Sequence, residues 1–429
     1  MNPLLSSHFS SRQPSAIRAA QIAFSQRTDD VRSINVAIGN VSLPMHPAMV
    51  ERMKSLGMNG SPFDSGIVKY SATVGFEETN QAFLHIISAS GFSVEKLVSQ
   101  VTEGGSQAME LCILGTCDKD RPLLLLEAAY TNYTSMAKRL GIETLSVSRS
   151  LQGNGTFSMP DMQVLEELIK SKNPGALVVI PYDNPTGQYI DTSQMAELAQ
   201  LCVKYNLWMI SDEAYRELHY TTKPTSSVWA LTDKIVPGIE GRRISIESTS
   251  KVWNACGLRI GAIVTDNNEY HKKSVAENTA NLCPNVIGQY IFGAITQIPK
   301  EELQDWFKKQ RAYYAPMLTK LTEELTELVP GIIISRPDAS LYSVVDVRNL
   351  VDESFESADF VDYCATKGSV EIDGNQYTLL VSPMGGFYSQ TENNPGRTQM
   401  RIAYVETPEN MQKIPKLFAT LFEEYTKSN

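Results

Sequence analysis

The sequence predicts an α/β fold, a three-layer sandwich with a mostly parallel central sheet between two layers of helices, and a smaller α+β domain beside it. Apolar runs of strand length recur between residues 122 and 265, and an amphipathic helical segment separates two of them. Apolar strands joined by crossover helices are typical of a parallel sheet that is buried on both faces. Beyond residue 300 charged helical segments dominate, and 429 residues are enough for two domains.

We therefore expect a large domain over residues 50–300 and a small domain formed by residues 1–49 and 301–429. The apolar runs that predict the strands of the large sheet are residues 122–128, 144–149, 175–182, 207–215, 242–248 and 259–265. The segment that predicts a crossover helix is 192–206, because its apolar residues recur at helical spacing. In the small domain, residues 301–329 predict a long helix, two strands flank a Gly- and Asn-rich loop at 384–398, and an amphipathic helix ends the chain.

Composition argues against several classes of protein. The formal net charge of −10 and the pI of about 5.2 argue against a nucleic-acid partner. The first twenty residues lack the apolar stretch of a signal peptide, and no apolar run is long enough to span a membrane. Six cysteines without a CxxC pair indicate reduced thiols in a cytoplasmic protein, and five dispersed histidines make a metal site unexpected.

Polar side chains follow three successive strands of the predicted sheet. Asn184 follows the strand 175–182, Asp212 and Tyr215 close the strand 207–215, and Ser248 and Lys251 follow the strand 242–248. Ligands of such sheets bind beyond the carboxyl ends of the strands. Each residue alone has an ordinary explanation as a turn, a helix cap or a surface charge. Their placement at consecutive strand ends favours a shared ligand.

The chemistry of these residue types fits an aldehyde cofactor with a pyridine ring and a phosphate. A desolvated lysine condenses with carbonyls, and a carboxylate keeps a pyridine nitrogen protonated so that the ring accepts electrons. Asparagine and tyrosine donate hydrogen bonds to a phenolic oxygen. Arg259 stands eight residues after Lys251, and an arginine, hydroxyls and a helix N-terminus bind phosphate.

The motifs SDEAY, DNPTG and STSK, with an arginine eight residues after the lysine, resemble those of the fold-type I pyridoxal-phosphate enzymes, specifically the class I/II aminotransferases. The resemblance spans essentially the whole chain. It implies that Lys251 forms the internal aldimine with pyridoxal 5'-phosphate (PLP) and later moves the proton between the substrate Cα and the cofactor C4′. It also implies that Asp212 pairs with the pyridine nitrogen, that Tyr215 and Asn184 hold the phenolic oxygen, and that Ser248 and Arg259 bind the phosphate.

Further residues match the family upstream of these motifs. TEGGSQAMELC resembles its phosphate-binding turn, with tight turning at Gly104 and Gly105, a helix cap at Ser106, and phosphate contacts from Gly105, Ser106 and Gln107. Tyr130 matches the aromatic residue that stacks on the cofactor ring. Tyr70 matches a tyrosine that reaches the phosphate of the neighbouring subunit, which implies a homodimer with shared active sites.

The substrate contacts that the resemblance implies are Arg401 on the α-carboxylate, with Asn184 and the backbone of Gly39 beside it. Two departures from the family pattern stand out. Glu103 occupies a position where asparagine or a small residue is common. The segment after the lysine carries no arginine for a second carboxylate, although Arg12 or Arg18 could serve instead.

The resulting prediction is an aminotransferase that moves an amino group between an amino acid and a 2-oxo acid by a ping-pong mechanism. A β-lyase or a cyclopropane-forming synthase of the same fold stays open, because the cofactor residues are common to all three. A non-enzymatic PLP-binding regulator is a further alternative, although no DNA-binding module is evident before the large domain. Tyr70, Tyr130 and Phe387 could line an apolar pocket, but the substrate stays open.

Overall fold

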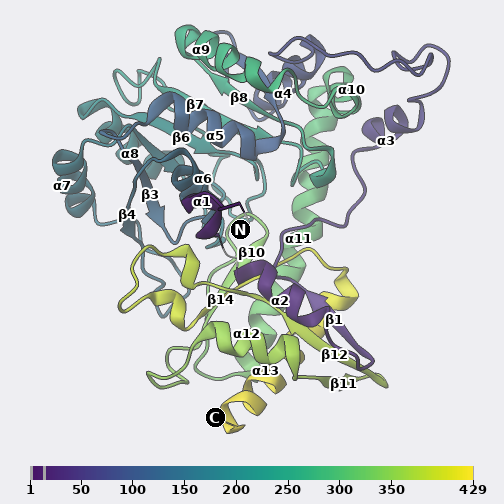
Figure 1. Cartoon of the computed structure of the whole chain (residues 1–429), viewed down its shortest axis with the longest axis vertical. Helices are drawn as coiled ribbons and strands as arrows, with labels where there is room; N and C mark the ends of the chain where they lie inside the picture. Colours follow the sequence, from purple (N-terminus) through teal and green to yellow (C-terminus); the bar gives the residue numbers. More distant parts are fainter. Residues whose placement is uncertain (1–2, 13–15, 429) are drawn as a thin grey trace.

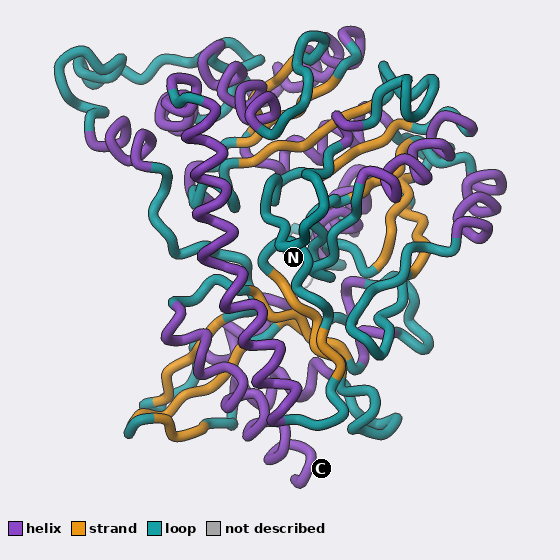
Figure 2. The backbone as a smooth tube through the Cα atoms, turned by 180° about the vertical axis from the view of Figure 1, so that it is seen from behind, coloured by secondary structure: helices purple, strands orange, loops and turns teal. Residues whose placement is uncertain are grey.

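The computed structural model describes residues 3–12 and 16–428. One part of the molecule is built around a seven-stranded sheet and the other around two smaller sheets (Figure 1). The long helix α11, Lys300–Leu328, connects them, because it contacts α4 of the first part and α13 and β9 of the second (Figure 2).

The large sheet contains all six predicted strands and one more. Its order is β2 (Val98–Thr102), β8 (Gly261–Thr265), β7 (Arg243–Ser248), β6 (Trp208–Asp212), β5 (Ala176–Val179), β3 (Leu123–Glu127) and β4 (Thr144–Ser148). Strands β4, β3, β5, β6 and β7 pair in parallel, whereas β8 runs antiparallel to both β7 and β2. The predicted mostly parallel sheet is confirmed.

Helices cover this sheet on both faces, as the three-layer prediction requires. Side chains alternate between the two faces of a strand, so Leu123 and Leu125 of β3 join one apolar core while Leu124 and Leu126 join the other. The first core is closed by α5 (Gly104–Thr116), α6 (Thr131–Leu140) and α9 (Asn268–Asn278). The second is closed by α4 (Glu77–Ala89), α7 (Met162–Lys172) and α8 (Thr192–Lys204). Helix α8 is the crossover helix that the sequence predicted.

The smaller part combines segments from both ends of the chain. One sheet has the order β1 (Val31–Asn35), β12 (Asn375–Leu380) and β11 (Val370–Ile372). The other has the order β13 (Ser382–Pro383), β14 (Gln399–Ala403), β10 (Tyr342–Asp346) and β9 (Ile333–Ile334). Helices α2 (Ala16–Phe24), α12 (Ser357–Thr366) and α13 (Pro408–Ser428) pack in this part. Helix α10 (Val286–Gly293) instead contacts α4 of the large part and α3 (Pro47–Lys54), and α1 (Ser7–Ser10) lies near the start of the chain. Because β1 pairs with β12, the N-terminal segment joins the C-terminal one, while the domain boundaries at 50 and 300 stay a prediction.

A buried charge cluster lies directly behind the carboxyl ends of β6 and β7. Arg216 forms ion pairs with Glu213 at 2.5 Å and with Glu247 at 2.6 Å, and all three side chains are almost completely buried. Ser211 and Ser227 donate hydrogen bonds to Glu213, and burial raises the pKa of this carboxyl group. The cluster therefore depends on one guanidinium that compensates two carboxylates.

We expect Arg216→Met to lower the free energy of unfolding by about 3–5 kcal/mol, because it leaves two buried carboxylates without their cation. Chemical denaturation monitored by circular dichroism measures this change. The matched control is Lys204→Ala, which removes an ion pair with Glu166 at the surface and should leave the free energy nearly unchanged. A change in Arg216→Met no larger than in the control would contradict the assigned role.

Candidate active site

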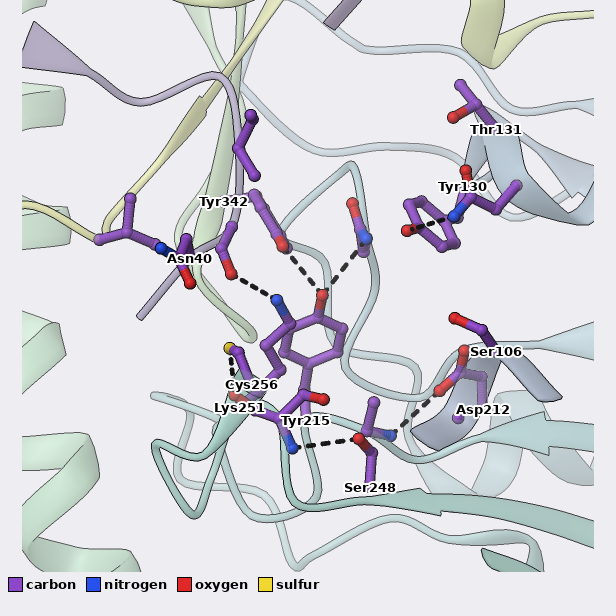
Figure 3. Close-up of a pocket in the computed structure, with 18 of the residues that line it drawn as sticks. Asn40, Ser106, Tyr130, Thr131, Asp212, Tyr215, Ser248, Lys251, Cys256 and Tyr342 are labelled. Carbon is purple, nitrogen blue, oxygen red and sulfur yellow. Dashed lines mark hydrogen bonds between the residues drawn. The ribbon is translucent and has the colours of Figure 1, made fainter. Parts of the chain in front are cut away.

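A cavity of about 900 Å³ lies at the carboxyl ends of β5, β6 and β7, between the large sheet and the smaller part. It brings together most of the residues that the sequence singled out. Those that line it are Gly39, Gly105, Ser106, Tyr130, Asn184, Asp212, Tyr215, Ser248, Lys251, Arg259 and Arg401. Figure 3 shows that Lys251, Tyr215, Asp212, Ser248 and Ser106 lie around one space.

Lys251 lies in the loop that connects β7 to β8, and its side chain reaches across the cavity. Its Nζ donates a hydrogen bond to the carbonyl of Gly39. Two hydrogen bonds hold the backbone of this loop. The Thr249 hydroxyl donates to the Ile260 carbonyl at 3.0 Å, and the indole N–H of Trp306 donates to the Val252 carbonyl at 2.9 Å. These bonds hold the backbone, so that the lysine amine is presented to the centre of the cavity.

Asp212, at the end of β6, is held by two hydrogen bonds. The Tyr133 hydroxyl donates to Oδ2 at 2.5 Å, and the Ala214 N–H donates to Oδ1 at 3.1 Å. Burial raises the pKa of the carboxyl group, and the bond from Tyr133 opposes that shift. A cationic group placed in the cavity beside Asp212 would favour its ionised form.

Asn184, Tyr215 and Arg401 form a connected group on the other side of Lys251. The Asn184 amide donates to the Tyr215 hydroxyl at 3.3 Å, and one terminal nitrogen of Arg401 donates to Asn184 Oδ1 at 2.8 Å. The other terminal nitrogen of Arg401 donates to the Ala37 carbonyl at 2.8 Å, whereas its buried Nε has no partner within the described part of the chain. Burial keeps the pKa of Tyr215 well above its usual value, so its hydroxyl retains its proton.

The N-terminus of α5, Ser248 and Arg259 form the polar end of the cavity. Free N–H groups and the positive end of the helix dipole make a helix N-terminus attractive to anions. Gly104 lies at φ +70°, and a Cβ at this position would overlap the Arg259 guanidinium, so the close approach requires glycine. The backbone N–H of Ser250 donates to the Ser248 oxygen at 3.1 Å, which leaves the Ser248 proton available to a ligand.

The start of α5 corrects one detail of the sequence prediction. The predicted cap at Ser106 is wrong, because the helix begins at Gly104 with Glu103 in the capping position, and Ser106 lies inside the first turn. The Gln107 side chain accepts from the Glu103 N–H at 2.7 Å, so it caps the helix start and does not line the cavity. The Glu103 carboxylate accepts from the Asn285 N–H at 2.6 Å and is thereby engaged at the start of α10.

Of three further residues that the sequence singled out, Tyr70, Arg12 and Arg18, only Arg18 lines the cavity. Tyr70 is 78% exposed and lies outside the lining of the cavity. Arg18 of α2 lines the cavity, whereas Arg12 donates to the His8 ring at 3.2 Å and does not line it.

Tyr133 and Tyr342 also line the cavity, but the sequence analysis did not single them out. The spacing of Tyr133 could have predicted its place in the cavity. It follows Tyr130 by three residues at the start of a helix, so the two side chains share a face. The two rings pack edge to face at 5.5 Å. For Tyr342 the sequence offered no comparable spacing.

The family described as aminotransferase class I and II matches residues 32–414 of the chain. The chain belongs to the class I and II aminotransferases. It is 26% identical over 364 residues to an aspartate aminotransferase of Sulfurisphaera tokodaii, covering 83% of this chain and 85% of that protein. It is also 26% identical over 278 residues to a 2-aminoadipate transaminase of Thermus thermophilus, covering 64% and 65% of the two chains.

Solved structures of aminotransferases share the fold. The N-succinyldiaminopimelate aminotransferase of Mycobacterium tuberculosis superimposes with a TM-score of 0.80 at 18% identity, covering 97% of this chain and all of that one. The kynurenine aminotransferase of Pyrococcus horikoshii gives 0.78 at 20% identity, covering 98% and 97%. This aminotransferase is therefore a PLP-dependent enzyme of fold type I, and none of these findings supports the lyase, synthase or regulator alternatives.

The residues present in the cavity fit this cofactor. The α5 N-terminus, Ser248 and Arg259 offer donors and positive charge for a phosphate, and Asp212 offers a carboxylate for a ring nitrogen. The amide of Asn184 and the hydroxyl of Tyr215 offer donors for a phenolic oxygen, and the amine of Lys251 lies among them.

Within residues 3–12 and 16–428, none of the helices combines the length and the apolar character that a membrane span requires.

Proposed function

We propose that this aminotransferase binds PLP through Lys251 and uses the cavity lining to transfer an amino group between an amino acid and a 2-oxo acid. The observation that carries this proposal is the convergence of Lys251, Asp212 and the Tyr215–Asn184 pair on one cavity with an anion-binding end. When bound, the cofactor supplies an aldehyde that condenses with amines and a ring that accepts an electron pair.

Each residue of the chain then has a physical task. Asp212, held by Tyr133, would keep the ring nitrogen protonated. Tyr215 and Asn184, which are hydrogen-bonded to each other, would donate to the phenolic oxygen. Ser248, Arg259 and the first turn of α5, with Gly105, Ser106 and the N–H of Gln107, hold the phosphate, and Tyr130 stacks on the ring. Arg401, beside Asn184 and the backbone of Gly39, binds the substrate carboxylate.

Lys251 moves the proton. Its Nζ lies beside Gly39. A substrate whose carboxylate is bound by Arg401 would have its Cα within reach of this amine. A neutral lysine amine can accept a proton, and Lys251 shares the cavity with Arg259 and Arg401. We propose that Nζ carries the proton between the substrate Cα and the cofactor C4′.

We expect Lys251→Ala to bind the cofactor without covalent attachment and to lose turnover by several orders of magnitude, because no other amine takes its place. Borohydride reduction of the wild-type holoenzyme, followed by peptide mass spectrometry, should find the label on the peptide that contains Lys251. The control is Lys96→Ala, a lysine paired with Glu240 at the surface. Near-normal turnover in Lys251→Ala, or a label on another peptide only, would overturn the assignment.

We propose that the preferred donors include amino acids with an acidic side chain. Two relatives are named for aspartate and 2-aminoadipate. The segment after Lys251 lacks an arginine, but Arg18 lines the cavity from α2 and can meet a side-chain carboxylate. Glu406 lines the same cavity.

Arg18→Ala should raise the KM for aspartate or 2-aminoadipate roughly tenfold, which is the loss of a charged hydrogen bond, and leave the KM for alanine unchanged. Steady-state kinetics with 2-oxoglutarate or pyruvate as acceptor measure both values. Arg12→Ala is the matched control, since Arg12 comes from the same N-terminal segment but does not line the cavity. An equal effect on alanine and on the acidic donors would contradict the role of Arg18.

We also propose a cytoplasmic homodimer in which Tyr70 reaches the phosphate of the other subunit. Exposed apolar side chains gather on two neighbouring segments, and they are Met53, Met58, Ile67, Val68, Tyr70, Leu282 and Ile287. The segments adjoin, because Phe63 packs edge to face on Tyr290 at 5.4 Å and Gln289 donates to Ser71 at 3.2 Å. Such a surface favours burial against a second copy.

The proposed cytoplasmic location has a separate support. The cysteines are all free thiols, as proteins of a reducing compartment usually have them.

Sedimentation of the wild type at micromolar concentration should give the mass of a dimer, and Ile67→Asp should shift it to the monomer with weaker cofactor binding. The reason is that the carboxylate introduced at position 67 would be buried in the interface without a partner of opposite charge. Val164→Asp, which changes an equally exposed apolar residue of α7, should leave the mass unchanged. A monomeric wild type would contradict the shared site.

A further inference from the structure

The hydroxyl of Tyr342 extends the hydrogen-bonded group that faces the cofactor site. We propose that Tyr342 is a positioning residue, whose hydroxyl donates to the Tyr215 hydroxyl and thereby strengthens the hydrogen bond from Tyr215 to the phenolic oxygen of the cofactor. This inference rests on the proposed function, and it assigns to a residue of the smaller part a task in tuning the cofactor.

The pairing of β10 with β14 places the Tyr342 ring. Val344 lies opposite Arg401 in the antiparallel register, and Tyr342, two residues before Val344, points from the same face of β10. The Arg401 guanidinium consequently lies over the Tyr342 ring, 4.4 Å from its centroid. The ring is 2% exposed and packs edge to face on Tyr215 at 5.7 Å. Its position is therefore fixed by packing on both sides.

The hydroxyl groups of Tyr342 and Tyr215 lie 2.9 Å apart, within hydrogen-bond distance. Figure 3 shows both groups directed toward one another beside Lys251. A Cβ on Gly39 would overlap the Tyr342 hydroxyl and lie 3.1 Å from Lys251 Nζ, so the glycine leaves room for both groups. The Tyr342 hydroxyl thus reaches the centre of the site although its backbone belongs to β10.

The number of protons fixes the direction of the bond. A tyrosine hydroxyl has one proton and can accept from two donors. An anionic phenolic oxygen accepts only, so Tyr215 must give its proton to that oxygen, and burial keeps this proton in place. The Tyr215 oxygen can then accept from Asn184 and from Tyr342. The resulting chain runs from Tyr342 through Tyr215 to the cofactor, and each bond of such a chain polarises the next.

The consequence is a stabilised anion on the phenolic oxygen. In a cofactor joined to Lys251, the linking nitrogen and this oxygen would share one proton, and stronger donation from Tyr215 would favour the form without that proton. Tyr342 therefore lowers the pH at which the bound cofactor loses its proton. The other charged and titratable groups that face the two hydroxyls come from several elements, and they are Arg401, Lys251, Asp212, Tyr130 and Tyr314.

The first experiment is a pH titration of the cofactor absorbance in wild type, Tyr342→Phe and Tyr404→Phe holoenzymes. Tyr342→Phe removes the hydroxyl and keeps the ring under Arg401, so the midpoint should rise by roughly 0.3 to 1 pH unit. Tyr404→Phe is the matched control, because it removes another buried hydroxyl, bonded to Ser343 of β10, outside the cavity lining. Its midpoint should equal that of the wild type.

The second experiment tests the route through Tyr215. In a Tyr215→Phe background the chain is already broken, so adding Tyr342→Phe should leave the midpoint where Tyr215→Phe alone puts it. A direct electrostatic effect of Tyr342 on Lys251 or on the cofactor would instead give the full shift again. Thermal unfolding of each variant, compared with Tyr404→Phe, shows whether the fold is retained, and the cofactor spectrum reports on the folded fraction alone.

The outcomes separate the inference from the proposed function. A wild-type protein without Lys251-linked cofactor absorbance overturns the proposed function itself. A wild type with that absorbance, in which Tyr342→Phe titrates at the same midpoint, overturns the inference and leaves the function standing. An equal shift in the Tyr215→Phe background also overturns it. A shift in the single variant that vanishes in the double variant supports it.

Discussion

The direction of neighbouring strands is the constraint on which the active site depends. Strands β5, β6 and β7 run in parallel, so Asn184, Asp212 and Ser248 emerge at one edge of the sheet. The antiparallel strand β8 then completes the site, because its first residue, Gly261, pairs with Ser248 on one side and with Thr102 of β2 on the other. This pairing brings Arg259 beside Ser248 and against the start of α5. Lys251 and Arg259 both belong to the loop 249–260 between β7 and β8, and Arg259 lies two residues before β8 begins.

The charged side chains of the cavity favour a ligand that carries both positive and negative groups. The cavity lining gathers the arginines Arg18, Arg259 and Arg401 and the amine of Lys251 with the carboxylates of Asp212 and Glu406. Behind Asp212, Glu247 of the buried cluster contributes a further negative field that raises the pKa of Asp212, while Lys251 and Tyr133 oppose it. A phosphate and a carboxylate would neutralise Arg259 and Arg401, and a protonated ring nitrogen would neutralise Asp212. A cofactor and an amino acid thus offer counterparts for these three charges.

The sequence was informative where local patterns decide the structure. Apolar runs predicted six of the seven strands of the large sheet but not β2, and the residues after β5, β6 and β7 lie where the parallel arrangement puts them. The helix cap was predicted at Ser106, three residues after its actual position at Glu103, where Gln107 reaches back to the Glu103 N–H. Local spacing could reveal neither the antiparallel turn of β8 nor contacts between distant segments. Tyr133 meets Asp212 across 79 residues, and Tyr215 meets Tyr342 across 127.

The contact between Arg401 and Asn184 connects the two parts of the site. Arg401 belongs to β14 of the smaller part, and Asn184 follows β5 of the large sheet, so their bond joins the two parts across the cavity. The remaining terminal nitrogen of Arg401 donates to the Ala37 carbonyl, and its guanidinium lies over the rings of Tyr342 and Phe387. The buried Nε is left without a partner in the described chain. An unsatisfied buried donor costs about 1–3 kcal/mol, so a carboxylate oxygen that reaches this nitrogen recovers free energy that an uncharged, carboxylate-free amine could not.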